Sequence, residues 1–180
     1  NYVLFNGFYW RIVRVNGNNS VRLIYQGTTI DGNGTTGSGY YEDEVKNAVN
    51  KTRSHAYVRY YYKTSSLEFS TIRQSIDSWY YTNLSSVTNY MDPDVGFCND
   101  YSTTSGTYGD TTTSSSVTFS GNSRLSSHSP SINCDDKHYE TPITSDRGTK
   151  SLPYPVGTIS MDEVMQAGGS NSNNNNYYLH

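Results

Sequence analysis

The sequence predicts an α+β fold, in which an antiparallel β-meander packs with one main amphipathic helix and a second short helix. Residues 1–27 alternate apolar with polar side chains around short turns. Residues 65–84 place apolar side chains at helical spacing, and residues 152–169 favour a strand that leads directly into a short helix. At 180 residues the chain is long enough for one domain with a core. We therefore expect a single domain over 1–180.

Two turn-forming dipeptides divide the meander into three strands. They are Asn6-Gly7 and Gly17-Asn18, and both are typical of a two-residue hairpin turn. Because side chains alternate between the faces of a strand, the registers of the two hairpins must agree if one face is to be buried. They do agree, and Arg11 and Arg22 fall on the opposite face. The predicted pairs are Phe5–Phe8, Val3–Trp10, Val15–Ser20, Ile12–Leu23 and Trp10–Tyr25. The predicted buried face comprises Val3, Phe5, Phe8, Trp10, Ile12, Leu23 and Tyr25.

Capping boxes mark the start of both helices. Ser65 and Glu68 begin the main helix, which we expect to lie across the buried face of the meander. Its apolar stripe comprises Phe69, Ile72, Ile76, Trp79, Tyr80 and Leu84, and its opposite side Glu68, Arg73, Gln74 and Asp77. Ser160 and Glu163 begin the short helix, and Gly168-Gly169 supplies its C-cap.

Two further segments are low in apolar residues. Residues 99–131 consist largely of Ser, Thr and Gly, so we predict a long loop that is either functional or partly disordered. Residues 170–180 form a low-complexity, Asn-rich tail.

The composition narrows the class of protein. Only 33% of residues are hydrophobic and 16% are charged, yet 18 tyrosines make the chain rich in aromatic residues. This balance is typical of secreted or surface β-rich proteins. The net charge of -3 and the lack of a basic run disfavour nucleic acid as a partner. No run approaches the roughly 18 apolar residues of a transmembrane helix. Because an initiator Met and a signal peptide are missing, we expect a piece of a longer protein.

The only two cysteines are Cys98 and Cys134. An even count in a chain of extracellular composition favours one disulfide between them. The alternative makes Cys98 a nucleophile with His128 or His138 as its base, although no protease signature surrounds it.

Metal-binding patterns are incomplete. Asp31, Asn33, Thr35 and Glu42 match ligand positions of an EF-hand calcium loop. However, Thr36 replaces the glycine that makes the sharp turn, and no helix is predicted before the loop. A second cluster, Asp135, Asp136 and His138, has too few Cys or His ligands for a structural zinc site. We predict solvated loops at both places, and hence no metal site.

The chain contains no Gly-x-Ser-x-Gly elbow, no P-loop and no dinucleotide-binding glycine motif after a strand. Its carboxylates are scattered, so no glycosidase pair stands out. We therefore expect no cofactor and no catalytic residues.

Four segments occur along the chain in this order: FYWRIVR (8–14), AYVRYYY (56–62), IDSWYYTNL (76–84) with GFCND (96–100), and YPVGTISMDE (154–163) with AGG (167–169). Together they resemble an uncharacterised repeat-like domain of large surface proteins from Gram-positive gut bacteria. That family in turn resembles the C-type-lectin-like fold shared with formylglycine-generating enzymes. The resemblance implies a secreted or wall-attached location and a paired Cys98 and Cys134.

The chain departs from the family pattern in two respects. Tyr101 stands where the family usually has Arg. Family members also continue with a Trp-containing Ser-Pro segment and a final Val-Arg-Pro strand, so we expect a C-terminally truncated version of the fold.

These observations lead to one main functional hypothesis, a non-enzymatic extracellular module of a bacterial surface that serves adhesion or binds a protein or glycan ligand. The mixture of Tyr with Ser, Asn and Gly resembles an antibody paratope. The alternatives are a carbohydrate-active or formylglycine-type enzyme fragment and a structural spacer in a surface stalk. An unpaired edge of the meander would also favour self-association.

Overall fold

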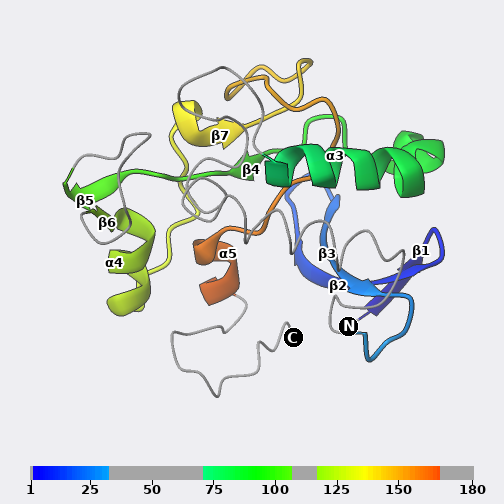
Figure 1. The fold of residues 1–180 in the computed structure, drawn as a ribbon, viewed down its shortest axis with the longest axis horizontal. Coiled ribbons are helices and arrows are strands. Elements are labelled where there is room, and N and C mark those ends of the chain that lie inside the picture. Colours follow the sequence, from blue (N-terminus) through cyan, green and yellow to red (C-terminus); the bar gives the residue numbers. More distant parts are fainter. Residues whose placement is uncertain (1, 33–70, 107–116, 167–180) are drawn as a thin grey trace.

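A computed structural model describes residues 2–32, 71–106 and 117–166, and it has the predicted mixture of helices and antiparallel sheet (Figure 1). The N-terminal meander consists of β1 (Tyr2–Phe5), β2 (Phe8–Val15) and β3 (Val21–Gly27), which are hydrogen-bonded in that order. The predicted turn at Asn6-Gly7 is confirmed. Both residues have positive φ, 50° and 81°, as a type I′ hairpin turn requires.

Four of the five predicted cross-strand pairs are confirmed: Phe5–Phe8, Val3–Trp10, Trp10–Tyr25 and Ile12–Leu23. The predicted core face is also correct in its centre. Phe8 is buried, and Phe5, Trp10 and Tyr25 pack against the core cluster to which it belongs. Val3, Ile12 and Leu23 are half-buried.

The second hairpin differs from its prediction because Val15 pairs with Val21 rather than with Ser20. The connection is therefore the five-residue loop 16–20 instead of a two-residue turn. Local hydrogen bonds stabilise the longer loop: the side chain of Asn18 accepts the backbone N–H of Ser20 at 3.0 Å, and Asn19 takes a φ of 66°.

The register shift that follows lies in β2, between Ile12 and Arg14. Val13 is the extra residue of this bulge, and it reverses the alternation of the strand. Without a bulge, Arg14 would share a face with Ile12. With it, Arg14 lies directly opposite Arg22, on the face that does not carry the aromatic core.

The main helix, α3 (Thr71–Leu84), lies across the meander as predicted and continues into η2 (Ser85–Tyr90). The indole of Trp79 is 5.5 Å from the ring of Phe8 and 5.2 Å from that of Tyr25. Trp79, Tyr80 and Leu84 are buried with Phe8 in one core. The predicted start of this helix, including Ser65, Glu68 and Phe69, lies outside the described residues.

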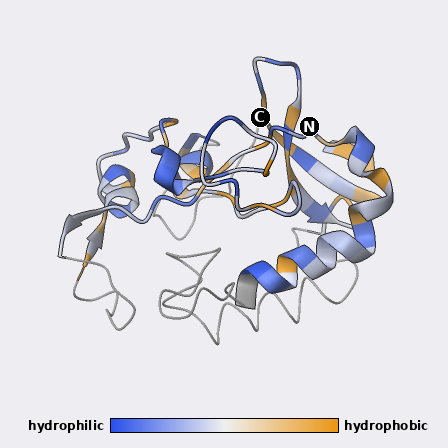
Figure 2. Cartoon of the chain, turned by 90° about the horizontal axis from the view of Figure 1, so that it is seen from above, coloured by the Kyte–Doolittle hydropathy of each residue, from blue (hydrophilic) through white to orange (hydrophobic). Residues whose placement is uncertain are grey.

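Arg73 was predicted on the side of α3 away from the core, but its exposed fraction is only 1%. The chain folds back over this side of the helix. The Arg73 Nη2 donates to the carbonyl of Ser151 at 2.6 Å, and its Nε donates to Asp77 at 3.1 Å. Gln74 is exposed, as expected. In Figure 2, α3 is mostly blue to pale, with little orange.

The remaining described elements are short. β4 (Phe97–Cys98) pairs with β7 (Tyr139–Glu140), and β5 (Thr103–Ser105) pairs with β6 (Thr118–Phe119). Three helical segments complete the order, α4 (Ser120–Ser126), η3 (Asp136–His138) and α5 (Met161–Gln166). The prediction of a loop throughout 99–131 is therefore wrong, because β5, β6 and α4 all lie within it.

The predicted strand at the start of 152–169 is also wrong. Leu152 makes a single isolated bridge with Pro142, and the residues from there to α5 form no ladder. Pro153 and Pro155 lack the N–H groups that a ladder needs. The capping box of α5 is confirmed: Ser160 Oγ accepts the N–H of Glu163 at 3.1 Å, and Glu163 accepts that of Ser160 at 3.0 Å. Gly168-Gly169 and the tail 170–180 lie outside the described residues.

Among the helices that the structure describes, none has the length and apolar character needed to cross a membrane.

Candidate binding lobe

Residues 99–106 and 117–131, here called the lobe, form a unit made of β5, β6 and α4. Figure 1 shows the lobe at one end of the molecule, the meander at the other, and α5 between them. Polar contacts link its two parts: Ser102 Oγ donates to Ser120 Oγ at 2.7 Å, and the backbone N–H of Ser120 donates to the carbonyl of Ser102 at 2.8 Å. The hydroxyl side chains that suggested a loop therefore help to order this segment.

A disulfide closes the base of the lobe. Cys98, in β4, is bonded to Cys134, with their Cα atoms 5.9 Å apart. The predicted pairing is confirmed, and the chain has no free thiol. The alternative, in which Cys98 is a nucleophile, is not compatible with this bond because a nucleophilic cysteine must be a thiolate.

Arg124 of α4 fastens the middle of the lobe. Its Nε and Nη2 donate to the two carboxylate oxygens of Asp162, each at 2.7 Å, and Nη2 also donates to Asp100 at 2.8 Å. The two parallel bonds to Asp162 have the fork geometry that makes arginine–carboxylate pairs strong. Asp162 belongs to α5, so this contact joins the lobe to the central helix.

The charges of this cluster stabilise one another. The hydrogen bond to Asp162 raises the pKa of Arg124; burial acts against this, but the bond to Asp100 adds to it. For Asp100, burial alone would raise the pKa, but hydrogen bonds from Ser102 and Arg124 outweigh it and lower the pKa below 3.8. Arg124 and Asp100 are therefore both ionised at neutral pH.

The carboxylate of Asp162 also binds the residue at the C-terminal end of the lobe, Ser131. The backbone N–H of Ser131 donates to Asp162 at 2.8 Å, and Asp162 itself is 7% exposed. Asp162 thus fixes both α4 and the segment that leaves it.

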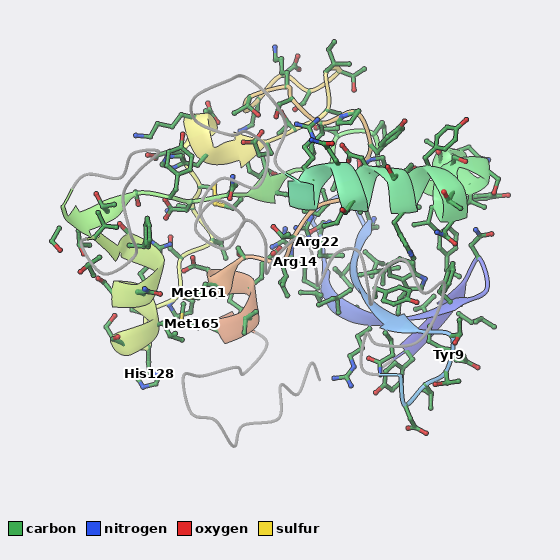
Figure 3. All side chains as sticks on the ribbon, viewed as in Figure 1. Tyr9, Arg14, Arg22, His128, Met161 and Met165 are labelled. Carbon is green, nitrogen blue, oxygen red and sulfur yellow. A yellow bond between two sulfur atoms is a disulfide. The ribbon has the colours of Figure 1, made fainter. Side chains whose placement is uncertain are left out.

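The next residue of α5, Glu163, binds the meander. Its carboxylate lies 3.3 Å from Nη1 of Arg14 and 3.2 Å from Nη2 of Arg22. Arg22 also covers the ring of Phe97 at 3.8 Å and donates to the carbonyl of Gly96 at 3.1 Å. Figure 3 shows Arg14 and Arg22 side by side on the meander. Through Asp162 and Glu163, α5 connects the lobe with the sheet.

The two histidines proposed as bases lie in different environments. His138 is buried, with Nδ1 3.3 Å from Asp100 and its ring 4.2 Å from that of Tyr101. His128 is exposed just beyond α4, with a φ of 51° (Figure 3). Neither has a thiol to activate.

The predicted metal candidates do not form a site in the described part of the chain. Asp135 and Asp136 have side chains that are 74% and 69% exposed, and they lie near Lys137 and Arg147 respectively. The described residues contain no group of His, Cys, Asp or Glu that could hold a metal ion.

The EF-hand-like pattern lies mostly beyond the described residues. Asp31 is exposed in a turn. Asn33, Thr35 and Glu42 lie outside the described ranges.

The outer surface of the lobe carries small polar side chains on this fixed frame. Its exposed members are Thr104, Ser105, Gly106, Thr118, Asn122, Ser126, Ser127, His128, Ser129 and Pro130. Hydroxyl, amide and imidazole groups of this kind can donate and accept hydrogen bonds with a polar ligand.

Sequence reasoning missed the acid–arginine cluster that holds the lobe. One signal was present, because only 16% of the chain is charged and Arg124 stands alone within a Ser/Thr-rich segment. An isolated cation in such a segment indicates a specific partner more strongly than one in a charged surface would.

Comparisons with models of protein families, with curated proteins and with solved structures found no match to this chain.

Proposed function

We propose that this protein is a non-enzymatic module of a bacterial surface, secreted or cell-wall attached, which binds a protein or glycan ligand through the exposed face of the lobe. One observation carries the proposal. The lobe is fastened by the Cys98–Cys134 disulfide, by Arg124 and by Asp162, while its outer face is exposed and polar. A surface that is rigid before binding loses little conformational entropy when a ligand docks.

The disulfide supports the extracellular location. Such bonds persist in oxidising compartments and are rare in the cytosol, where thiols are kept reduced. The pair closes a loop with a sequence separation of 36, long enough for the bond to restrain the unfolded chain substantially.

The bonding of the buried ionisable groups supports binding rather than catalysis. Arg124 is paired with both Asp100 and Asp162, and Glu163 is shared by two arginines. Glu140, which is 4% exposed, accepts hydrogen bonds from the hydroxyls of Thr149 and Ser151. Groups engaged in this way stabilise the fold.

We further propose that the architecture is C-type-lectin-like. The packing of α3 on the N-terminal meander and the disulfide that closes a long segment support this proposal. An experimental structure of the whole chain tests it, since a different order of strands around the meander would overturn it.

The proposed ligand surface can be tested with matched substitutions. Ser105→Arg and Ser126→Arg each place a long charged side chain on the exposed lobe, and Ser78→Arg places the same side chain on the exposed face of α3. Binding is measured on a glycan array and a panel of immobilised extracellular host proteins. We expect at least a tenfold loss for either lobe variant on the ligand that binds, and no change for Ser78→Arg.

Other outcomes favour the alternatives. Equal binding by all three variants would move the ligand site away from the lobe, and the lack of any ligand would favour a spacer of a surface stalk. Two reactive thiols in the purified native protein would contradict the disulfide and restore the enzymatic hypothesis, a carbohydrate-active or formylglycine-type fragment.

A further inference from the structure

β1 is an edge strand of the meander, and among the described residues it pairs only with β2. Proteins usually protect such an edge with a charged residue, a proline or a bulge. β1 has none of these: its sequence is Tyr2-Val-Leu-Phe5, and the bulges of the sheet lie between β2 and β3. Tyr2 and Leu4 are apolar side chains with exposed fractions of 41% and 63%. The strand therefore has the features of a pairing surface.

The turn at Asn6-Gly7 determines which backbone groups face outward. In a two-residue hairpin, the residues that flank the turn, here Phe5 and Phe8, exchange both of their backbone hydrogen bonds. The alternation then directs the N–H and C=O of Val3 toward β2 as well. Those of Tyr2 and Leu4 point to the outer edge of the sheet.

We propose that this edge pairs with β1 of a second copy of the chain, in the antiparallel direction, to form one continuous sheet. In the proposed register Tyr2 lies opposite Leu4 of the second copy, and Val3 lies opposite its own counterpart on a two-fold axis. The contact is isologous, so it closes after two copies. It does not involve the lobe and goes beyond the function proposed above.

The proposed register between the two β1 strands follows from the backbone N–H and C=O groups that point to the outer edge of the sheet. Only when Tyr2 faces Leu4 of the second copy do all the outward N–H and C=O groups of both strands find partners within β1. Placing Leu4 opposite Leu4 would set Tyr2 against Asn6, which is already in the turn with a φ of 50°. Placing Tyr2 opposite Tyr2 would leave Leu4 beyond the end of the other strand.

The side chains are complementary in this register. Directly opposite residues lie on the same face of an antiparallel sheet, so the exposed Tyr2 ring would contact the exposed Leu4 of the second copy, an aromatic–aliphatic pair. Neither β1 carries a charge that would repel its counterpart. Arg11 lies over the ring of its own Tyr2 at 5.4 Å.

A strand of four residues is short for an interface. Stable protein–protein interfaces usually bury at least about 1,200 Å². We therefore expect a weak, concentration-dependent dimer. Its occupancy would increase where many copies are held close together.

Cysteine cross-linking tests both the partner and the register. Because both native cysteines are in the disulfide, Val3→Cys introduces the only free thiol. Val3 and its counterpart would form a non-hydrogen-bonded pair with Cα atoms about 4.5 Å apart, within the range of a disulfide. We expect Val3→Cys to form covalent dimers at least tenfold faster than Leu4→Cys, which would face Tyr2, or Val21→Cys, which is exposed on β3.

Sedimentation velocity supplies a test that needs no new cysteine. The average sedimentation coefficient of the unsubstituted chain should rise with concentration, and that of Leu4→Lys should not, because two lysines would be brought near the axis. Matching far-UV circular dichroism shows that each variant is folded.

Two results would overturn the proposal. One is cross-linking of Val3→Cys no faster than that of Val21→Cys, and the other is a sedimentation coefficient of the unsubstituted chain that does not change with concentration. Faster cross-linking of Leu4→Cys than of Val3→Cys would overturn the register.

Discussion

Asp162 and Glu163 are adjacent in the first turn of α5, yet their carboxylates bind arginines from opposite parts of the molecule. Asp162 binds Arg124 of the lobe, and Glu163 binds Arg14 and Arg22 of the meander. Both acids are 7% exposed. A helix of six residues thus connects, through ion pairs, two regions that lie far apart in sequence.

Replacing Glu163 by Gln should destabilise the protein strongly. The amide can still accept the N–H of Ser160, so the capping box remains, but buried Arg22 loses its counter-charge. Removing one partner of a buried ion pair costs about 3–5 kcal/mol of the free energy of unfolding, as measured by urea denaturation. Asp135→Asn, in an exposed ion pair with Lys137, is the control and should change stability by less than about 1 kcal/mol. Similar losses for the two variants would contradict the central role of Glu163.

Acid should weaken the attachment of the lobe. The pKa of Asp100 is lower in the folded protein than its ordinary value of 3.8, so its contribution to stability is fully present above that pH. This contribution is lost as the pH falls through the lowered pKa. Asp77 acts in the opposite direction, because burial raises its pKa despite the hydrogen bond from Arg73.

Urea midpoints between about pH 2 and about pH 6 measure this dependence. The unsubstituted chain should lose stability at the acid end, and Asp100→Asn should have a flatter profile in that window. Parallel profiles would show that Asp100 does not contribute.

Removing the disulfide with Cys98→Ser and Cys134→Ser together should lower the free energy of unfolding by about 3–4 kcal/mol, because a long loop is no longer closed in the unfolded chain. The only two tryptophans, Trp10 and Trp79, lie in the core 6.3 Å apart. Tryptophan fluorescence should therefore keep its native emission, while limited proteolysis within the lobe becomes faster. An unchanged rate of cleavage would indicate that the ionic contacts alone hold the lobe.

Gly96→Ala should disrupt the packing beside β4. A Cβ at this position would lie 2.1 Å from Cζ of Tyr139, so the ring would have to move. Overpacking of this kind costs about 1–3 kcal/mol, as measured by thermal or chemical unfolding. Adding Tyr139→Leu should recover part of the loss. Gly17→Ala is the matched control, because nothing lies within 4 Å of its Cβ and its φ is not positive. Equal effects at the two glycines would contradict this explanation.

The fold of the meander could be predicted because its signals are local. The Asn6-Gly7 turn, the alternation in β1 and β2 and the aromatic residues of the core all lie within the first 27 positions. The Ser160–Glu163 capping box is also local, since both of its hydrogen bonds span three residues. Each of these follows from propensity and periodicity.

Burial of Arg73 could not be predicted in this way. Its partner at the carbonyl of Ser151 is 78 residues away. On a helical wheel the residue belongs to the polar side, and only the return of the chain over α3 buries it. Arg124 and Asp162 are likewise 38 residues apart. The composition of the lobe predicted a loop, because Ser and Thr have low helix propensity. The Cys98–Cys134 disulfide and the ion pairs of Arg124 hold the lobe in an ordered structure, and neither can be read from helix propensity.

The bulge at Val13 shifts the alternation of side chains along β2 by one residue. By adding one residue it turns Arg14 to the same face as Arg22, and only then can both arginines reach Glu163. A substitution of Val13 that keeps the bulge would leave Arg14 on this face. Deleting Val13 would also leave Arg14 opposite Arg22, in a regular ladder, whereas a ladder that kept Val13 without a bulge would turn Arg14 to the core face. During evolution, the placement of Arg14 opposite Arg22 should therefore be more constrained than the identity of the residue in the bulge.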